Sequence, residues 1–231
     1  MKRFLILVLA GLVLLAAFPA AAQDAATPRF EPGDCIFQSP AGQEPECGYL
    51  IVPEDRSNPD GNTIQIAVAR FKSTNPNPPD DAMIYLEGGP GGSTLENISL
   101  SFDSLFAPYL ADRDVIAFDQ RGVGLSQPTL DCPELTDMTY AMLDQRITVD
   151  ESVRLGAEAI SACGARLQSD GINLAAYNSV ESAADVNDLR QVLGYDQLDL
   201  LGISYGTRLA LTIMRQQPEG LRAVILDSVW P

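Results

Sequence analysis

Apolar and polar positions along the chain first predict a pair of neighbouring strands. Residues 49–53 form a short apolar run, and between residues 63 and 71 the apolar side chains recur at a period near two. The segment at 58–62 reads Asn-Pro-Asp-Gly-Asn, which is typical of a turn. We therefore expect the two strands to form a hairpin.

From residue 82 onward, short apolar strands alternate with helical patterns. Strands are predicted at residues 82–86, 114–118, 198–201 and 222–226, and helices at 93–110, 180–193 and 205–216. Ser179 is placed to cap the second of these helices. Such alternation is typical of an α/β fold, with a mostly parallel sheet covered by helices on both faces.

Two segments depart from this alternation. Residues 23–45 are rich in Pro, Ala and Gly and are expected to form an irregular arm. Residues 131–176 are expected to leave the sheet as an excursion, with one helix near residues 151–167. No internal repeat or low-complexity tract accompanies them.

The chain contains four cysteines, and their spacing favours disulfide bonds. They are Cys35, Cys47, Cys132 and Cys163, none of which belongs to a C-x-x-C pair, so neither a metal site nor a redox site is expected. Three pairings are possible. We favour the nearest-neighbour pairing, Cys35 with Cys47 and Cys132 with Cys163, in an exported protein whose compartment allows oxidation.

The first 22 residues have the features of a signal peptide. Lys2 and Arg3 precede an apolar run over residues 4–18, and small residues up to Ala22 follow. We expect cleavage after Ala22, which leaves residues 23–231 as an exported chain, periplasmic or extracellular, without a stable membrane anchor. An uncleaved anchor is the alternative, but the apolar run is short against the roughly 20 residues that a spanning helix needs.

The charge balance excludes one class of partner. The chain has 15 Lys and Arg against 31 Asp and Glu, a formal net charge of −16. Nucleic acids are bound by clusters of Lys and Arg, and the sequence has no such cluster, so a nucleic-acid partner is not expected. We attribute the acidity to a solvated surface.

A serine between two glycines carries the strongest chemical signal. Gly202-Ile203-Ser204-Tyr205-Gly206 lies between an apolar run and a helical pattern. Small residues on both sides let the chain turn sharply and expose the serine hydroxyl. The start of the helix adds unpaired N–H groups and a partial positive charge, which stabilise an anionic intermediate. This context predicts Ser204 as a catalytic nucleophile.

A glycine-rich segment follows the strand at 82–86. It reads Glu87-Gly88-Gly89-Pro90-Gly91-Gly92-Ser93. Glycines let backbone N–H groups approach a substrate oxygen, as an oxyanion hole requires. The alternatives are a phosphate-binding loop, which is disfavoured because no Gly-Lys-Ser/Thr follows, and a plain tight turn.

A third motif, Asp119-Gln120-Arg121-Gly122-Val123-Gly124-Leu125-Ser126, follows the strand at 114–118. A loop arginine is most often paired with a nearby carboxylate, so we favour a structural role for Arg121 over a substrate contact. Asp119 and Asp227, which both follow strands, are weaker candidates for the acid of a catalytic triad.

Together, GGPGG, DQRGVGLS and GISYG resemble the proline iminopeptidase and tripeptidyl aminopeptidase branch of the α/β-hydrolase family, over about residues 47–231. The resemblance implies that Ser204 is the nucleophile and that the N–H groups of Gly89 and Tyr205 form the oxyanion hole. It also implies a reaction without metal or cofactor. The expected substrates are small peptides, from whose N-termini residues are released, or esters, which some relatives cleave.

Two departures from the family pattern qualify this expectation. Glu87 stands where many relatives have His. Its carboxylate is expected to shape the site, to meet a substrate amine, or to be solvated or ion-paired. The 231 residues also contain no His, whereas the family places an acid and then a His after the nucleophile. We therefore expect an inactive N-terminal fragment with the first six strands, without the lid and the last two strands.

Other functions remain open at this point. An esterase or lipase on the same fold is one alternative, and a non-catalytic binding protein that keeps the fold without the base is another.

Overall fold

The computed structural model describes residues 27–231, so the predicted signal peptide lies outside the described residues. Seven strands are present: β1 (Arg29–Pro32), β2 (Glu46–Pro53), β3 (Thr63–Phe71), β4 (Asp81–Leu86), β5 (Asp114–Phe118), β6 (Gln197–Ile203) and β7 (Leu221–Asp227). The α-helices are α1 (Thr94–Leu105), α2 (Pro133–Met142), α3 (Val149–Ser169), α4 (Ser179–Val192) and α5 (Tyr205–Gln216). Short 3₁₀ turns are η1 (Ala107–Tyr109), η2 (Leu174–Ala176) and η3 (Pro218–Gly220).

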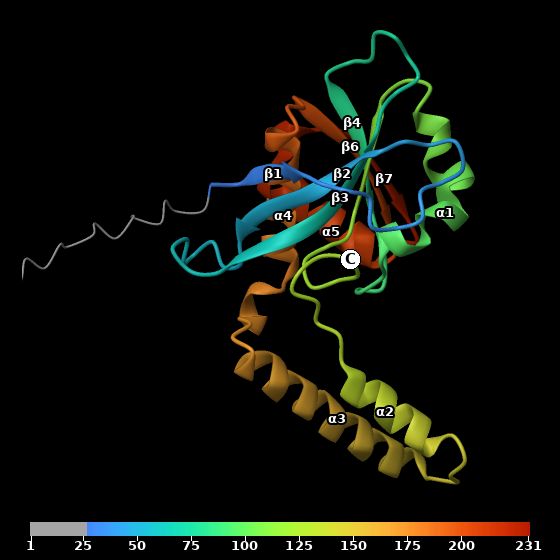
Figure 1. Ribbon diagram of the computed structural model, residues 1–231, viewed down its shortest axis with the longest axis vertical. Helices are drawn as coiled ribbons and strands as arrows, with labels where there is room; N and C mark the ends of the chain where they lie inside the picture. The colour runs from blue at the N-terminus through green and yellow to red at the C-terminus, as the bar shows by residue number, and fades with distance from the viewer. Residues whose placement is uncertain (1–26) are drawn as a thin grey trace, which may run out of the picture.

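All seven strands form one sheet in the order β1-β2-β3-β5-β4-β6-β7 (Figure 1). The first three strands pair antiparallel, whereas β5, β4, β6 and β7 are parallel. The carboxyl ends of the four parallel strands therefore lie at one edge of the sheet, where ligands bind in open α/β sheets. The predicted α/β class is confirmed.

Helices cover both faces of the sheet. On one face, Leu95, Ile98 and Phe102 of α1 pack against the inward side chains of the strands. On the other face, α4 and α5 contribute an apolar stripe that includes Val186, Leu189 and Leu209. Strands β4 and β5 are buried along their whole length because both of their faces are covered.

The hairpin predicted from period-two patterning is confirmed. Strands β2 and β3 pair antiparallel, with Leu50 opposite Ile66. Both side chains are buried. Glu54 N–H donates to Asn62 O (2.8 Å) where the turn begins, which closes the hairpin.

The arm expected at residues 23–45 contains a strand, and the expectation that it is irregular throughout was wrong. Strand β1 pairs antiparallel with β2, so the sheet has one strand more than predicted. Its four residues include a single large apolar side chain, Phe30, which packs partly buried against the core. An edge strand this short, ending in Pro32, carries no detectable period.

The excursion between β5 and α4 is a helical hairpin rather than a single helix. Helix α2 was not predicted, and α3 is longer than expected at both ends. The two helices pack along each other and extend away from the sheet (Figure 1). None of the residues of α2 is buried, so its sequence lacks the apolar stripe that reveals a helix. Over residues 27–231, no helix has both the length and the apolar character to cross a membrane.

Two helix ends differ from the sequence prediction. Asn178, not Ser179, caps α4, because its Oδ1 accepts from the N–H groups of Val180 and Glu181 (2.9 and 3.0 Å). Helix α1 ends at Leu105, before the turn that contains Pro108, instead of continuing to residue 110.

The two disulfides are Cys35–Cys47 and Cys132–Cys163, the pairing favoured from the sequence. The first attaches the segment after β1 to strand β2. The second joins Cys132, the residue before α2, to Cys163 in the C-terminal half of α3. Each bridge restricts the unfolded chain and thereby stabilises the native fold.

A buried arginine joins three segments beside the sheet. The side chain of Arg121 is 1% exposed. Its Nε and Nη2 donate to the two carboxylate oxygens of Asp185 on α4 (2.8 and 2.7 Å). Its Nη1 also donates to Glu54 O and Ala176 O, both at 2.7 Å. Arg56 Nη2 donates to Oδ1 of the same carboxylate (2.7 Å). The structural role expected for Arg121 is thus observed.

We predict that Arg121→Ala strongly destabilises the protein. Removal of the guanidinium leaves the carboxylate of Asp185 and two carbonyl groups without this partner in the interior, which costs about 3–5 kcal/mol. Urea unfolding followed by circular dichroism measures this loss. Arg154→Ala on α3 is the control, because Arg154 pairs with Glu151 and Glu158 on the exposed surface and should change stability far less. Equal losses for the two variants would contradict the account.

Candidate active site

Ser204 occupies a sharp turn between β6 and α5. Its backbone has φ 53° and ψ −118°, a combination that is sparsely populated for residues other than Gly and costs about 1–3 kcal/mol. Neighbouring groups hold this conformation. Ser204 N–H donates to Asp227 O on β7 (3.0 Å), and Ser204 O accepts from the N–H and the hydroxyl of Thr207 (2.9 and 2.6 Å). Such a strained strand-to-helix turn is the geometry of a nucleophile elbow.

The glycines on either side of Ser204 are required by close backbone packing. A Cβ at Gly202 would lie 2.6 Å from Gly206 O, and a Cβ at Gly206 would overlap the carbonyl oxygen of Leu86 at the end of β4. Helix α5 therefore begins against the backbone of β4. Any side chain at either glycine would push the helix away and tilt Ser204.

The glycine-rich loop after β4 runs directly beside the Ser204 hydroxyl. A Cβ at Gly88 would lie 3.2 Å from Ser204 Cβ and 3.7 Å from Ser204 Oγ. Gly89 has φ +112°, which only Gly adopts readily, and Gly92 N–H donates to Gly88 O (3.3 Å) to close the turn. Gly89 and Tyr205, the two residues expected to donate N–H groups to an oxyanion, thus belong to segments that meet at Ser204.

Glu87 turns its carboxylate back onto its own loop. Its Oε1 accepts from Gly88 N–H (2.7 Å), and its Oε2 lies 3.4 Å from the hydroxyl of Tyr85. Burial, followed by the charge of Glu87, raises the pKa of the Tyr85 hydroxyl, which therefore stays protonated. These contacts support the shape of the glycine-rich loop, and a contact between Glu87 and a substrate amine stays a prediction.

The third motif, residues 119–126, also contributes to the wall around the site. Asp119 is fully buried and accepts from the Ser93 hydroxyl (2.9 Å) and from the N–H groups of Leu95 (3.0 Å) and Leu125 (2.9 Å). Burial raises its pKa, and the N–H donors oppose that shift. These bonds attach the loop to the start of α1, so the Asp119 carboxylate has a structural role. Gln120 Nε2 donates to Glu87 O (3.1 Å) and joins the second and third motifs.

The three motifs surround a pocket of about 390 Å³. Its wall includes Pro90 from the glycine-rich loop, Gln120 from the third motif and Tyr205 from the serine motif, and Asp131 and Ser182 line it as well. The Tyr205 hydroxyl is 2.9 Å from Ser179 Oγ, which fixes the ring over the start of α4. The sequence did not identify Asp131 and Ser182, because neither belongs to a motif.

The described part of the chain contains one cluster of side chains of the types that bind metals. Cys132, Glu134 and Cys163 bring ligand atoms within 4.8 Å of one another. The two sulfur atoms form a disulfide, so neither is a thiolate, the form that binds metals. Among residues 27–231, no side chain donates to or accepts from Ser204 Oγ.

Fold and site together define the class of the protein: the chain belongs to the α/β-hydrolase fold family, whose model matches residues 81–231. It is 31% identical over 185 residues to the serine protease Hip1 of Mycobacterium tuberculosis. It is also 31% identical over 204 residues to a tripeptidyl aminopeptidase of Streptomyces coelicolor. These similarities support the peptidase-like branch of the family that the motifs predicted.

The matches cover most of this chain and a smaller part of the relatives. They span 79% of this chain and 35% of Hip1, and 85% of this chain and 37% of the aminopeptidase, so the chain spans about a third of the length of these relatives. Among solved structures, the chain matches a proline iminopeptidase-related protein from Thermus thermophilus with a TM-score of 0.46 and 22% identity, over 79% of this chain and 44% of that protein.

Gly206→Ala is predicted to destabilise the protein, because the new methyl group overlaps the main chain of Leu86. The expected loss is about 3 kcal/mol, at the upper end of the cost of overpacking. Gly156→Ala is the matched control. Gly156 lies inside α3, and a Cβ there meets only Met138 Cε at 3.9 Å. That variant should gain about 0.5–1 kcal/mol from helix propensity. Urea unfolding of both variants checks the prediction, and a Gly206→Ala protein as stable as the parent would refute it.

Proposed function

We propose that this chain is part of an exported serine hydrolase that releases residues or short peptides from the N-termini of peptides, with Ser204 as the nucleophile. The observation that carries the proposal is the strained turn at Ser204, anchored to β7 and placed beside the glycine-rich loop. The similarity to a serine protease and to a tripeptidyl aminopeptidase supports a peptide substrate.

In this mechanism, Ser204 Oγ attacks the carbonyl carbon of the substrate. The negative charge that develops on the carbonyl oxygen is stabilised by the N–H groups of Gly89 and Tyr205 and by the positive end of helix α5. Loss of the amine gives an acyl-enzyme, which water hydrolyses. The rigid turn is useful here because the donors are already oriented before the charge forms.

We propose that the group that accepts the Ser204 proton lies outside these 231 residues. The 231 residues contain no His, and they match about a third of the length of the relatives. In α/β-hydrolases the acid and the His follow the nucleophile in the chain. The isolated 231 residues should therefore show little or no turnover.

Export is proposed from the basic and apolar character of residues 1–22 and is supported by two disulfides, which form in oxidising compartments. The acidic chain and the lack of a Lys/Arg cluster support a peptide rather than a nucleic-acid partner.

The experiment is to compare the full-length gene product with its Ser204→Ala variant on a tripeptide-aminomethylcoumarin substrate and on a short-chain p-nitrophenyl ester. We expect turnover of the tripeptide and a loss of kcat on the order of 10⁶-fold in the variant, as for serine proteases without their nucleophile. Ser104→Ala, which changes an exposed serine of α1, is the control and should keep full activity. Turnover of the ester alone would favour the esterase, and an active Ser204→Ala variant would contradict the proposal.

A further inference from the structure

The tip of the helical hairpin, residues 143–148, joins α2 to α3 at the end that lies farther from the sheet (Figure 1). Residues 145–148 belong to no helix, strand or turn. Within residues 27–231, neither Arg146 nor Ile147 forms a hydrogen bond or an ion pair, through main chain or side chain. The peptide bond between these two residues is therefore held only by its neighbours in the chain.

Arg146 differs from the other basic residues that lie outside helices and strands. Its side chain is exposed and unpaired within the described residues, whereas a carboxylate engages each of the others. In the range 27–231 these others are Arg56, Lys72, Arg113 and Arg121. The free guanidinium of Arg146 can enter the acidic specificity pocket of a protease that cleaves after basic residues, as trypsin does.

The helix ends on both sides of the tip are weakly anchored. Helix α2 buries none of its residues, and the buried residues of α3 all lie from Ala159 onward, away from the tip. Opening the last turn of α2 or the first turn of α3 therefore exposes little buried apolar surface and costs little free energy. Exposed tips of this kind are where proteases preferentially cut a folded chain.

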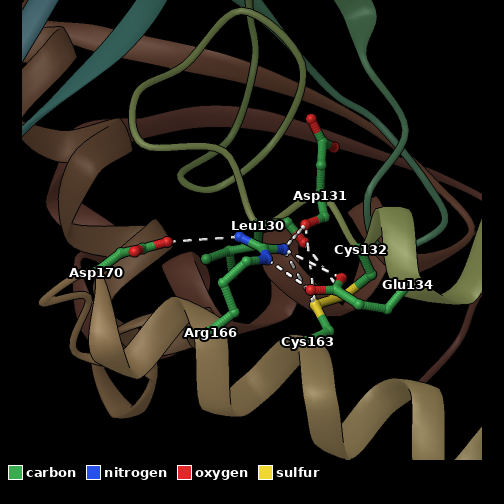
Figure 2. The surroundings of a disulfide bond; sticks show 7 residues. All are labelled: Leu130, Asp131, Cys132, Glu134, Cys163, Arg166 and Asp170. Atoms are coloured by element: carbon green, nitrogen blue, oxygen red, sulfur yellow. Dashed lines mark hydrogen bonds and ion pairs between the residues drawn. A yellow bond between two sulfur atoms is a disulfide. The ribbon is translucent and has the colours of Figure 1, made fainter.

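A disulfide at the base of the hairpin encloses the tip. Cys132 precedes α2 and Cys163 lies on α3, so a cut at residue 146 falls between the two bridged cysteines. Beside the bridge, Arg166 of α3 donates to Glu134 (2.6 Å) and to the main-chain oxygen of Asp131 (2.8 Å), as Figure 2 shows. The two sides of the cut thus stay joined by a covalent bond and by an ion pair.

The sheet also joins the two pieces that such a cut would make. The first piece contains β4 and the glycine-rich loop, and the second contains β6 and Ser204. Strands β4 and β6 pair in parallel from Asp81 opposite Gln197 to Leu86 opposite Gly202. A cut at the tip therefore breaks none of the strand pairing that brings the glycine-rich loop to Ser204.

From these observations we propose that the Arg146–Ile147 peptide bond is a processing site, at which a protease that cleaves after basic residues converts the chain into a two-chain form held by the Cys132–Cys163 bridge. Water adds across the bond, so that Arg146 gains a carboxylate and Ile147 gains an ammonium group. The two chains share one sheet, and the candidate active site contains residues of both.

The first test is limited digestion of the full-length gene product with trypsin under native conditions, followed by electrophoresis with and without reductant and by N-terminal sequencing. Within residues 27–231, the first new N-terminus should read Ile147-Thr148-Val149. The two pieces should stay together without reductant and separate with it. A first cut elsewhere in this range, or pieces that separate without reductant, would overturn the proposal.

Two arginine variants make this test specific. Arg146→Gln should slow cleavage within residues 27–231 about tenfold, because the remaining basic residues lie in folded or ion-paired segments that must unfold first. The matched control is Arg154→Gln, since Arg154 is exposed but lies within α3 and is paired with Glu151 and Glu158. That variant should be cut as fast as the parent. Equal rates for Arg146→Gln and the parent would contradict the assignment.

Processing itself is read from the exported full-length protein, recovered in the presence of protease inhibitors, reduced, and analysed by mass spectrometry. We expect a chain that begins at Ile147, and we expect Arg146→Gln to abolish it. Recovery of the uncut chain alone would overturn the processing site, even if trypsin cuts at Arg146. None of these measurements uses turnover, so their outcome is independent of the role of Ser204.

Discussion

The close approach of helix α5 to strand β4 at Gly206 determines where the groups of the site meet. Because no side chain separates the two backbones, α5 begins directly at the end of β6, and Ser204 is forced into a conformation with positive φ. The same contact places the N-terminus of α5 next to the glycine-rich loop. The Ser204 hydroxyl, the glycine-rich loop and the start of helix α5 thus converge through packing of main chain against main chain, which needs few side chains.

The side chains around this centre mainly hold loops in place. Asp119 connects the loop after β5 to the start of α1, and Arg121 connects that loop to α4 and to the β2–β3 hairpin. Both are buried ionic or polar groups that are costly to leave unpaired, so the loops have few alternative positions. These contacts therefore hold in place the loops that form most of the pocket wall.

Most of the sheet and the elbow could be predicted from sequence because their signals are local. Buried strands such as β4 are continuous apolar runs, and the turn at Ser204 needs small residues at fixed positions. Strand β1 and helix α2 escaped prediction because the first has one large apolar side chain and the second buries none. The pocket escaped prediction for another reason: Gln120, Asp131 and Ser182 belong to separate elements, and only the tertiary fold brings them together.

The central claim is that Ser204 is the nucleophile of a serine hydrolase, and the most direct measurement is covalent labelling of the full-length gene product with a fluorophosphonate, followed by peptide mass spectrometry. The account predicts one modified site, on the peptide that contains Ser204, and protection of that site by a competing tripeptide. A protein that reacts at another serine, or that turns over peptides while Ser204 stays unmodified, would contradict it.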